Sequence, residues 1–180
     1  MQQPHYLVPT HTDGAEIDIT YTLHADLVEE AEDIFVDAKD RLLDVTHWAR
    51  YAGLADVRFA LADGHRHIVS RKARRADHIM IDGPGQPHME YDAYTIDALE
   101  YDDFPDTNLE TFAIRMRPSE REATDNTGDT ATIVIVRKGA QLSATYHGRN
   151  SPTGGDGLWH GISNTEWEAL MRGLIAYFDR

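Results

Sequence analysis

A predicted hairpin and a helix in the last third of the chain form its most regular pattern. Residues 131–137 and 141–147 flank a Lys-Gly turn, as the two strands of a hairpin do. The first strand includes the unbroken apolar sequence 133–136, which is typical of a strand buried on both faces near the middle of a sheet. The helix that follows has one apolar stripe, made of Trp167, Leu170, Met171, Leu174 and Phe178. We expect the hairpin and this helix to pack together as the core.

The first third of the chain predicts a strand followed by a helical region. From Ala15 onward, apolar residues alternate with polar ones, which indicates a strand with one buried face. Asp26 followed three residues later by Glu29 matches a variant of the capping box. Apolar residues then recur at helical spacing over 27–45, and Gly53 is expected to end the element.

The middle of the chain predicts antiparallel strands joined by short turns. Apolar alternation over 57–61 precedes Asp63-Gly64, a strong hairpin-turn signal, so we expect a return strand over 65–72. Within 88–101 the apolar positions change parity. Because a strand changes face only where a residue is inserted, we expect at least one bulge and a strongly bent strand there.

The closing helix has a clear start and one unexplained residue. Ser163-Asn-Thr-Glu166 matches the Ser-x-x-Glu capping box, so the helix is expected to begin there. Gly173 lies inside it, off the centre of the apolar stripe. Glycine disfavours a helix interior, and the sequence alone offers no reason for its presence.

The element order indicates an α+β fold. We expect an extended arm over 1–14 and a single α+β domain over 15–180, with a bent, mostly antiparallel sheet of six to seven strands wrapped over the C-terminal helix. Over 15–178 this order, with the opening AEIDITYTLHADLVEEAEDIFVDAKDRLLDVTHW, resembles the helix-grip fold of the START/Bet v 1-like superfamily. The ending, YHGRN followed by a Trp-containing helix, is similar to that of uncharacterised bacterial proteins. The alternative fold is a closed barrel with its helices packed outside.

The resemblance implies a ligand cavity between the sheet and the closing helix. Aromatic and methionine residues fill the core in most folds, but in a helix-grip fold they would line that cavity. His147 and Arg149, near the end of a buried strand, are expected at its mouth, although they could instead belong to a local turn at Gly148. The candidate ligand-binding residues are Tyr91, Tyr94, Met116, Tyr146, His147, Arg149, Trp167 and Met171.

Composition excludes several classes of function. The chain has 31 acidic and 17 basic residues, a net charge of −14, which disfavours nucleic acid as a partner. No apolar stretch is long enough for a membrane span, and the N-terminus lacks the pattern of a secretory signal. The absence of cysteine excludes disulfides and thiol chemistry and fits a cytoplasmic protein. The oligomeric state is not predicted.

A basic strip interrupts the acidic sequence over residues 65–75. A positive strip on an acidic body favours an anionic ligand or an acidic partner. It could equally pair with the chain's own acidic helix over 26–44. The candidate anion-binding residues are Arg66, Arg71, Lys72, Arg74 and Arg75.

The ten histidines suggest a metal site but do not form a metal-binding motif. His65 and His67 have a chelating spacing, and a third ligand would come from His78, His88, His147 or His160. Scattered surface histidines are the commoner explanation, so no metal is predicted. No GxSxG, GxGxxG, Walker or EF-hand pattern is present, so we expect no cofactor and no clear catalytic apparatus.

Three functions remain after these exclusions. The first is a module that binds a small, partly apolar or amphipathic molecule in an internal pocket. The second is a protein-interaction module that uses the acidic surface or the basic strip. The third is a small hydrolase or cyclase that uses His147 with a tyrosine.

Overall fold

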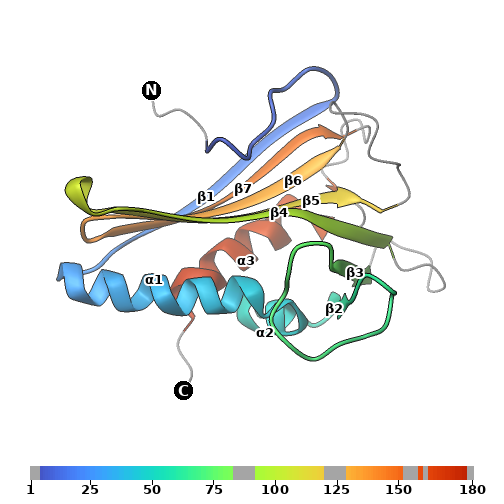
Figure 1. Ribbon diagram of the computed structural model, residues 1–180, viewed down its shortest axis with the longest axis horizontal. Helices are drawn as coiled ribbons and strands as arrows, with labels where there is room; N and C mark the ends of the chain where they lie inside the picture. The colour runs from blue at the N-terminus through green and yellow to red at the C-terminus, as the bar shows by residue number, and fades with distance from the viewer. Residues whose placement is uncertain (1–4, 83–91, 120–128, 152–157, 160–161, 178–180) are drawn as a thin grey trace.

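The computed structural model describes residues 5–82, 92–119, 129–151, 158–159 and 162–177. The described residues form three α-helices and two short 3-10 turns, which are interspersed among the strands (Figure 1). In chain order the elements are β1 (Ala15–His24), α1 (Val28–Leu43), η1 (Val45–His47), α2 (Trp48–Ala52), β2 (Arg58–Ala62), β3 (His78–Asp82), β4 (Asp92–Phe104), η2 (Pro105–Thr107), β5 (Leu109–Pro118), β6 (Thr130–Lys138), β7 (Gln141–Ser151), β8 (Leu158–Trp159), β9 (Ile162–Ser163) and α3 (Asn164–Ala176).

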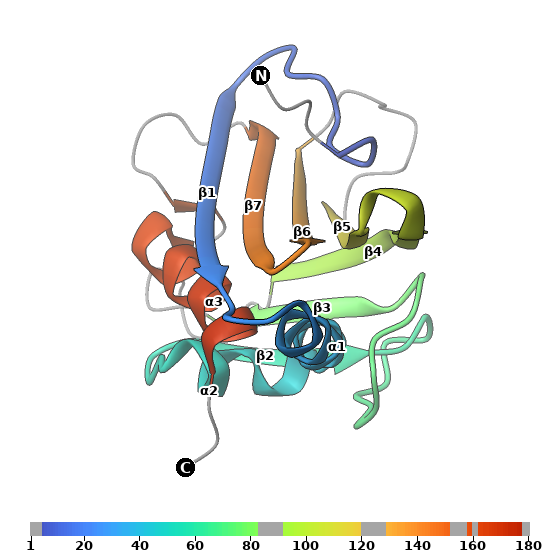
Figure 2. The same cartoon turned by 90° about the vertical axis from the view of Figure 1, so that its left-hand side faces the viewer.

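The main sheet has seven strands in the order β1-β7-β6-β5-β4-β3-β2, and every neighbouring pair is antiparallel. Strands β1 and β2 form its edges, so the sheet is open, and the alternative of a closed barrel is wrong. Helices α1 and α3 lie on the same side of the sheet (Figures 1 and 2). We call this side the inner face and the opposite side the outer face. The predicted α+β class, with a C-terminal helix and an N-terminal helix region, is confirmed.

Strand β6 is apolar on both faces because both faces are covered. Ile133 and Ile135 belong to the main core cluster on the inner face. On the outer face Val134 packs with Leu7 and Val8 of the N-terminal segment, in a second cluster. The segment 5–14, which we call the arm, therefore continues the core across the sheet. This explains the unbroken apolar sequence that predicts a buried central strand.

Strand β4 contains the bulge that the parity shift predicts. The register against β5 shifts between Ile96 and Ala98, which leaves Asp97 as the inserted residue. The Asp97 carboxylate accepts hydrogen bonds from Arg115, at 2.8 Å, and from Arg117. The bulge thus presents a carboxylate to two arginines of the neighbouring strand.

The helical region ends as predicted but begins differently. Gly53 caps α2 with φ 69°, a conformation that glycine adopts without strain. The predicted N-cap at Asp26 is wrong, because Leu27 occupies the N-cap position of α1 and makes no side-chain cap. The Glu30 carboxylate, rather than that of Glu29, accepts from the Asp26 backbone N–H at 3.2 Å. The Glu30 side chain thus bonds to a backbone N–H four residues earlier, whereas a capping box joins residues three apart.

The predicted return strand over 65–72 is wrong. The segment forms one isolated bridge, between Ala62 and Ile68, and the strand that pairs with β2 is β3. The Asp63 carboxylate accepts from the backbone N–H groups two and four residues later, both at 2.9 Å. This side-chain bonding satisfies the turn locally and takes the place of a strand ladder.

The closing helix α3 begins at the predicted capping box, and its glycine marks a close contact. The Ser163 side chain accepts from the Glu166 N–H, and the Glu166 carboxylate accepts in return from the Ser163 N–H. A Cβ at Gly173 would lie 2.1 Å from the Tyr51 carbonyl oxygen of α2. Glycine therefore allows the two helix backbones to touch. Among the described residues no helix is long and apolar enough to cross a membrane.

Candidate functional site

Five of the predicted ligand-binding residues gather on the inner face. Each is at most 1% exposed and belongs to the main core cluster. They come from three strands and from α3, so the fold brings together positions far apart in the sequence. They are Tyr94, Met116, Tyr146, Trp167 and Met171. Tyr91, the sixth aromatic or methionine candidate, lies outside the described residues.

An aromatic stack lies at the centre of this group. The rings of Tyr146 and Trp167 are parallel to within 14°, with centroids 4.4 Å apart. Tyr146 points inward from β7, and Trp167 lies in the first turns of α3, directly after the capping box. Burial raises the pKa of Tyr146 well above its ordinary value, so its hydroxyl stays neutral. The interior therefore contains large rings that carry neutral polar tips.

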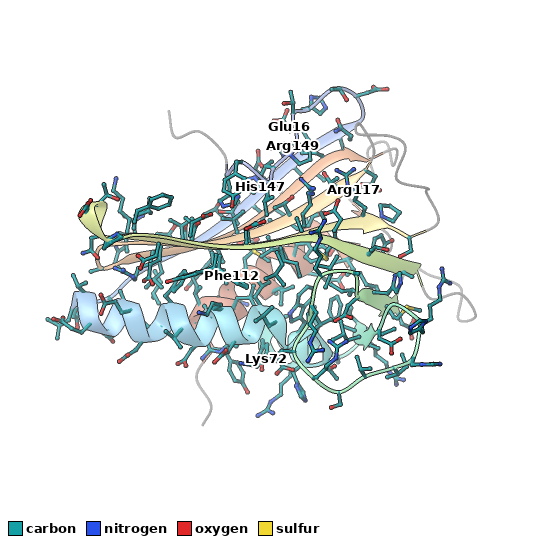
Figure 3. All side chains as sticks on the ribbon, in the orientation of Figure 1. Glu16, Lys72, Phe112, Arg117, His147 and Arg149 are labelled. Carbon is teal, nitrogen blue, oxygen red and sulfur yellow. The ribbon has the colours of Figure 1, made fainter. Side chains whose placement is uncertain are left out.

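The sheet separates the remaining two candidates from this group. Successive residues of a strand point to opposite faces, so Tyr146 points inward while His147 points outward. Figure 3 shows His147 and Arg149 on the side of the sheet opposite to Phe112, a core residue. The seven candidates among the described residues therefore occupy two places, and His147 and Arg149 do not line the interior.

On the outer face His147 and Arg149 share one carboxylate. The His147 Nδ1 lies 2.5 Å from an Asp18 oxygen, and an Arg149 guanidinium nitrogen lies 2.9 Å from the same oxygen. Arg149 also donates to the carbonyl oxygens of Ile17, at 3.2 Å, and Gly148, at 2.9 Å. Asp18 stands directly opposite His147 in the pairing of β1 with β7. Strand register thus assembles the triad.

The pKa values of the triad follow from burial and hydrogen bonding. Burial lowers the pKa of His147, and the hydrogen bond to Asp18 opposes this only in part. Burial alone would raise the pKa of Asp18, but hydrogen bonds from His147 and Arg149 outweigh it and lower that pKa. Near neutral pH the triad is thus a neutral imidazole, a carboxylate and a guanidinium.

The triad borders a groove of about 420 Å³ on the outer face. We call it the outer groove. It is lined by the arm residue His5, by hydroxyl-bearing side chains of β1, β5 and β7, and by His147. Sequence reasoning singled out His147 as a candidate but expected it at the mouth of the inner cavity, although the exposed polar positions of β1, which include Asp18 and Thr20, alternate with half-buried ones. That alternation was the available signal. Which strand lies beside β1 is decided only by the fold.

The basic strip divides into paired and exposed residues. Arg71 pairs with Asp77 at 2.7 Å, within the same loop, and Lys72 pairs with Asp40 of α1 at 2.6 Å. The contact between Lys72 and Asp40 agrees with the alternative expectation that the basic strip pairs with the chain's own acidic helix. A cavity of about 470 Å³ lies between α1 and residues 70–72. Lys72 is exposed despite its pair, and the other exposed basic candidates of the strip are Arg66, Arg74 and Arg75.

The histidines of the described residues form no metal cluster. No group of three His, Asp or Glu side chains suited to a metal ion occurs in the described part of the chain. His65 and His67 lie close, with ring centroids 6.3 Å apart, in an exposed turn. His88 and His160, two of the candidate third ligands, lie outside the described residues.

Comparison with known proteins finds similarity only among solved structures. No protein-family model matches the chain, and no curated protein matches it. A structural-genomics target from Nitrosospira multiformis is 9% identical, covering 91% of this chain and 97% of its own, with a TM-score of 0.46. A major latex-like protein from Panax ginseng is 8% identical, covering 89% and 93%, with a TM-score of 0.41. Truncated norcoclaurine synthase from Thalictrum flavum is 12% identical, covering 94% and 99%, with a TM-score of 0.40.

At such low identities and TM-scores these likenesses say nothing of function. The evidence for the fold is the molecule's own topology. A strand, a helical region, an antiparallel sheet and a closing helix across its inner face follow in the order that the sequence predicts. In its fold, the chain resembles the START/Bet v 1-like helix-grip superfamily.

Proposed function

We propose that the protein is a module that binds a small, partly apolar molecule between the inner face of the sheet and α3. The observation that supports this most is the stack of Tyr146 on Trp167, in the same core cluster as two methionines, Met116 and Met171. Tyrosine and tryptophan combine a large apolar body with a hydrogen-bonding tip. Methionine adapts its shape to what it contacts. Together they suit an aromatic or amphipathic ligand.

The two ends of α3 differ in how firmly they are held, which favours entry near Trp167. Gly173, in the second half of the helix, is in backbone contact with Tyr51. Arg41 of α1 donates to the Leu174 carbonyl oxygen at 3.0 Å. These contacts fix the C-terminal half of the helix. A side-chain movement at Trp167, in the first turns, is the smaller change and would admit a ligand against Tyr146.

The test is whether the folded protein retains or takes up such a molecule. Freshly purified protein is examined by native mass spectrometry, and emptied protein is titrated with the amphipathic fluorophore 8-anilinonaphthalene-1-sulfonate. We expect a retained mass, or saturable fluorophore binding that quenches tryptophan emission.

A variant of the inner face tests where the molecule binds. Tyr146→Phe removes one inner hydroxyl and should weaken binding several-fold. Tyr101→Phe is the matched control, because Tyr101 is 45% exposed and bonds to Glu110 outside this group. Folded protein that binds neither ligand nor fluorophore would overturn the proposal.

A second function is supported by the exposed part of the basic strip. Ile68 is 70% exposed and stands in the same loop as the exposed Arg66, Arg74 and Arg75. An apolar side chain among cations on an otherwise acidic molecule suits an acidic protein partner. The alternative proposal is therefore a protein-interaction module that uses this loop.

Binding to a model polyanion distinguishes this alternative. Poly-L-glutamate should bind at low salt and dissociate as ionic strength rises to about 0.2 M, because exposed charges are then screened. Replacing Arg66, Arg74 and Arg75 together by alanine should abolish that binding. Arg58→Ala, at an exposed position of β2, is the control and should preserve it. Equal loss in both variants, or no binding at low salt, would argue against the strip as the contact surface.

A further inference from the structure

The outer groove assembles side chains from the arm and from four strands of the sheet. The arm contributes His5, β1 contributes Asp18, β5 contributes Thr111, β6 contributes Val134, and β7 contributes His147. Its volume of about 420 Å³ lies within the range of about 300–1,000 Å³ usual for small-molecule sites. None of these side chains belongs to the inner-face group, and the sheet lies between the two places.

His147 presents a fixed hydrogen-bond acceptor to this groove. A carboxylate only accepts hydrogen bonds, so the 2.5 Å contact with Asp18 requires the proton to be on Nδ1 of the imidazole. Because the ring is neutral, Nε2 then carries a lone pair. Arg149 keeps Asp18 ionised and in place at 2.9 Å. The triad therefore sets one tautomer and one orientation of the His147 ring.

Hydroxyl groups supply the remaining polar contacts. Thr20 and Thr145 bond to each other across β1 and β7 at 2.9 Å, and Ser143 and Thr22 extend the same face. Each hydroxyl can both donate and accept. Between them Val134 adds an apolar surface. A ligand that fits such a lining has many hydroxyls on its edges and C–H groups on its faces.

The charges around the groove favour a neutral ligand. Asp18 is the charged member of the triad that lines the groove, and it pairs at 2.9 Å with Arg149, which also lies 3.7 Å from Glu16 outside the lining. His5, at the other side, lies 3.8 Å from Asp102, and burial lowers its pKa, so it is neutral near pH 7. The net charge of −14 disfavours an anionic ligand in this groove, which lies outside the basic strip.

We propose that the outer groove is a binding site for a neutral, multiply hydroxylated small molecule of the carbohydrate class, with His147 Nε2 as its principal acceptor. The arm forms one wall of this site. Its two ends are fixed by the sheet, through the Asn150 side-chain oxygen, which accepts from the Thr12 N–H at 2.8 Å, and through the Tyr6 hydroxyl, which donates to Asp102 at 2.8 Å. The site thus exists in the folded chain before a ligand arrives.

The experiment is an NMR titration of the full chain with maltose as the neutral probe. Glucose 6-phosphate serves as the anionic comparison, and spermidine as the cationic one. We expect saturable shifts of the His5 and His147 imidazoles and of the Val134 methyl groups, with a dissociation constant on the order of 1 mM. Maltose that leaves these resonances unmoved would overturn the proposal. Tighter binding of either charged probe at the same resonances would overturn the assigned ligand class.

Variants separate this site from the inner one. Thr22→Tyr adds a ring at an exposed edge position of the groove and should weaken maltose binding at least tenfold while the protein stays folded. Thr145→Val removes one hydroxyl at constant shape and should weaken it several-fold. Thr46→Val, exposed in η1, is the matched control and should change nothing.

Tyr146→Phe, on the inner face, should also leave maltose binding intact. If Tyr146→Phe and Thr145→Val weakened maltose binding equally, the ligand would lie in the interior and the outer site would be refuted. Undiminished binding by folded Thr22→Tyr would refute it as well. Maltose binding does not depend on retention of an apolar molecule, so this proposal and the proposed function can fail independently.

Discussion

At the scale of single residues, Gly173 shows how a neighbouring backbone decides the identity of one side chain. Taken alone, a glycine inside a helix costs about 1 kcal/mol relative to alanine. Here a Cβ would lie 2.1 Å from the Tyr51 carbonyl oxygen and 2.5 Å from its carbon, both backbone atoms. These atoms move only if α2 moves. The close contact between α2 and α3 therefore requires a glycine at position 173.

Gly173→Ala should consequently destabilise the protein, against the helix propensities. We expect the free energy of unfolding to fall by about 2–3 kcal/mol, as for an overpacked core, measured by urea denaturation. Gly64→Ala is the control, because a Cβ there meets only the Ala76 carbonyl oxygen at 4.0 Å. That variant should stay within about 0.5 kcal/mol of the parent. A Gly173→Ala protein as stable as the parent would mean that the helices are not in this contact.

At the scale of elements, one asparagine holds the C-terminal end of the arm to the sheet. The Asn150 side-chain oxygen accepts from the backbone N–H groups of Thr12, at 2.8 Å, and Asp13, at 3.2 Å. Asn150 itself adopts φ 59°, a left-handed conformation that asparagine tolerates better than most residues. Both its backbone and its side chain therefore suit the end of β7. Through this residue the strand keeps the arm across Val134.

Asn150→Gly should release the arm without straining the backbone. We expect faster amide hydrogen exchange at Thr12 and Asp13 and a loss of about 1–2 kcal/mol in the free energy of unfolding, because the backbone donors lose their acceptor. Asn150→Ala should lose about 1 kcal/mol more, since alanine disfavours the left-handed conformation. The difference between the two variants isolates the backbone contribution. Unchanged protection of both amides in Asn150→Gly would show that the apolar contacts of the arm suffice.

At the scale of the whole molecule, partly buried histidines make stability depend on pH. Burial lowers the pKa of His5, His78 and His147 below the ordinary value of 6.5. The unfolded chain therefore binds more protons than the folded one once the pH falls below about that value, and acidification favours unfolding. Asp18 and Asp77 have pKa values lowered below 3.8 in the folded state, so their contribution is lost only at much lower pH.

The free energy of unfolding should accordingly be level between about pH 7 and pH 9 and decrease in two stages on acidification. The first stage begins near pH 6.5 and belongs to the histidines, and the second begins below about pH 4 and belongs to the aspartates. Urea titrations at constant ionic strength measure both. His65→Gln should retain the first stage, because His65 is exposed in a turn, whereas His147→Gln should reduce it. A maximum of stability at or below pH 5.5 would contradict this account.

Much of the fold could be predicted because its signals are local. The capping box at Ser163, the left-handed Gly53 and the bulge at Asp97 each follow from a few neighbouring residues. The prediction of a return strand over 65–72 was wrong, because a local interaction outside the usual turn patterns decides the conformation there. The apolar pattern of the segment is weak, and the Asp63 side chain satisfied the turn in a way that propensities do not describe.

Of the candidate sites, the sequence indicated the residue types but not how they are grouped. Alternation along β7 already places Tyr146 and His147 on opposite faces, because successive strand residues point in opposite directions. Whether they share a site depends on what covers each face. On the inner face that cover is α3, and on the outer face it is the arm.

The sequence by itself determined most of the elements, their amphipathic faces and the buried central hairpin, because hydrophobic periodicity and capping act within a few residues. Only the tertiary structure decided that Asp18 meets His147 and Arg149, that Gly173 touches Tyr51, and that the arm forms one wall of the outer groove. These contacts join positions that are far apart in the chain. Strand order and helix docking bring them together, and no local pattern encodes either.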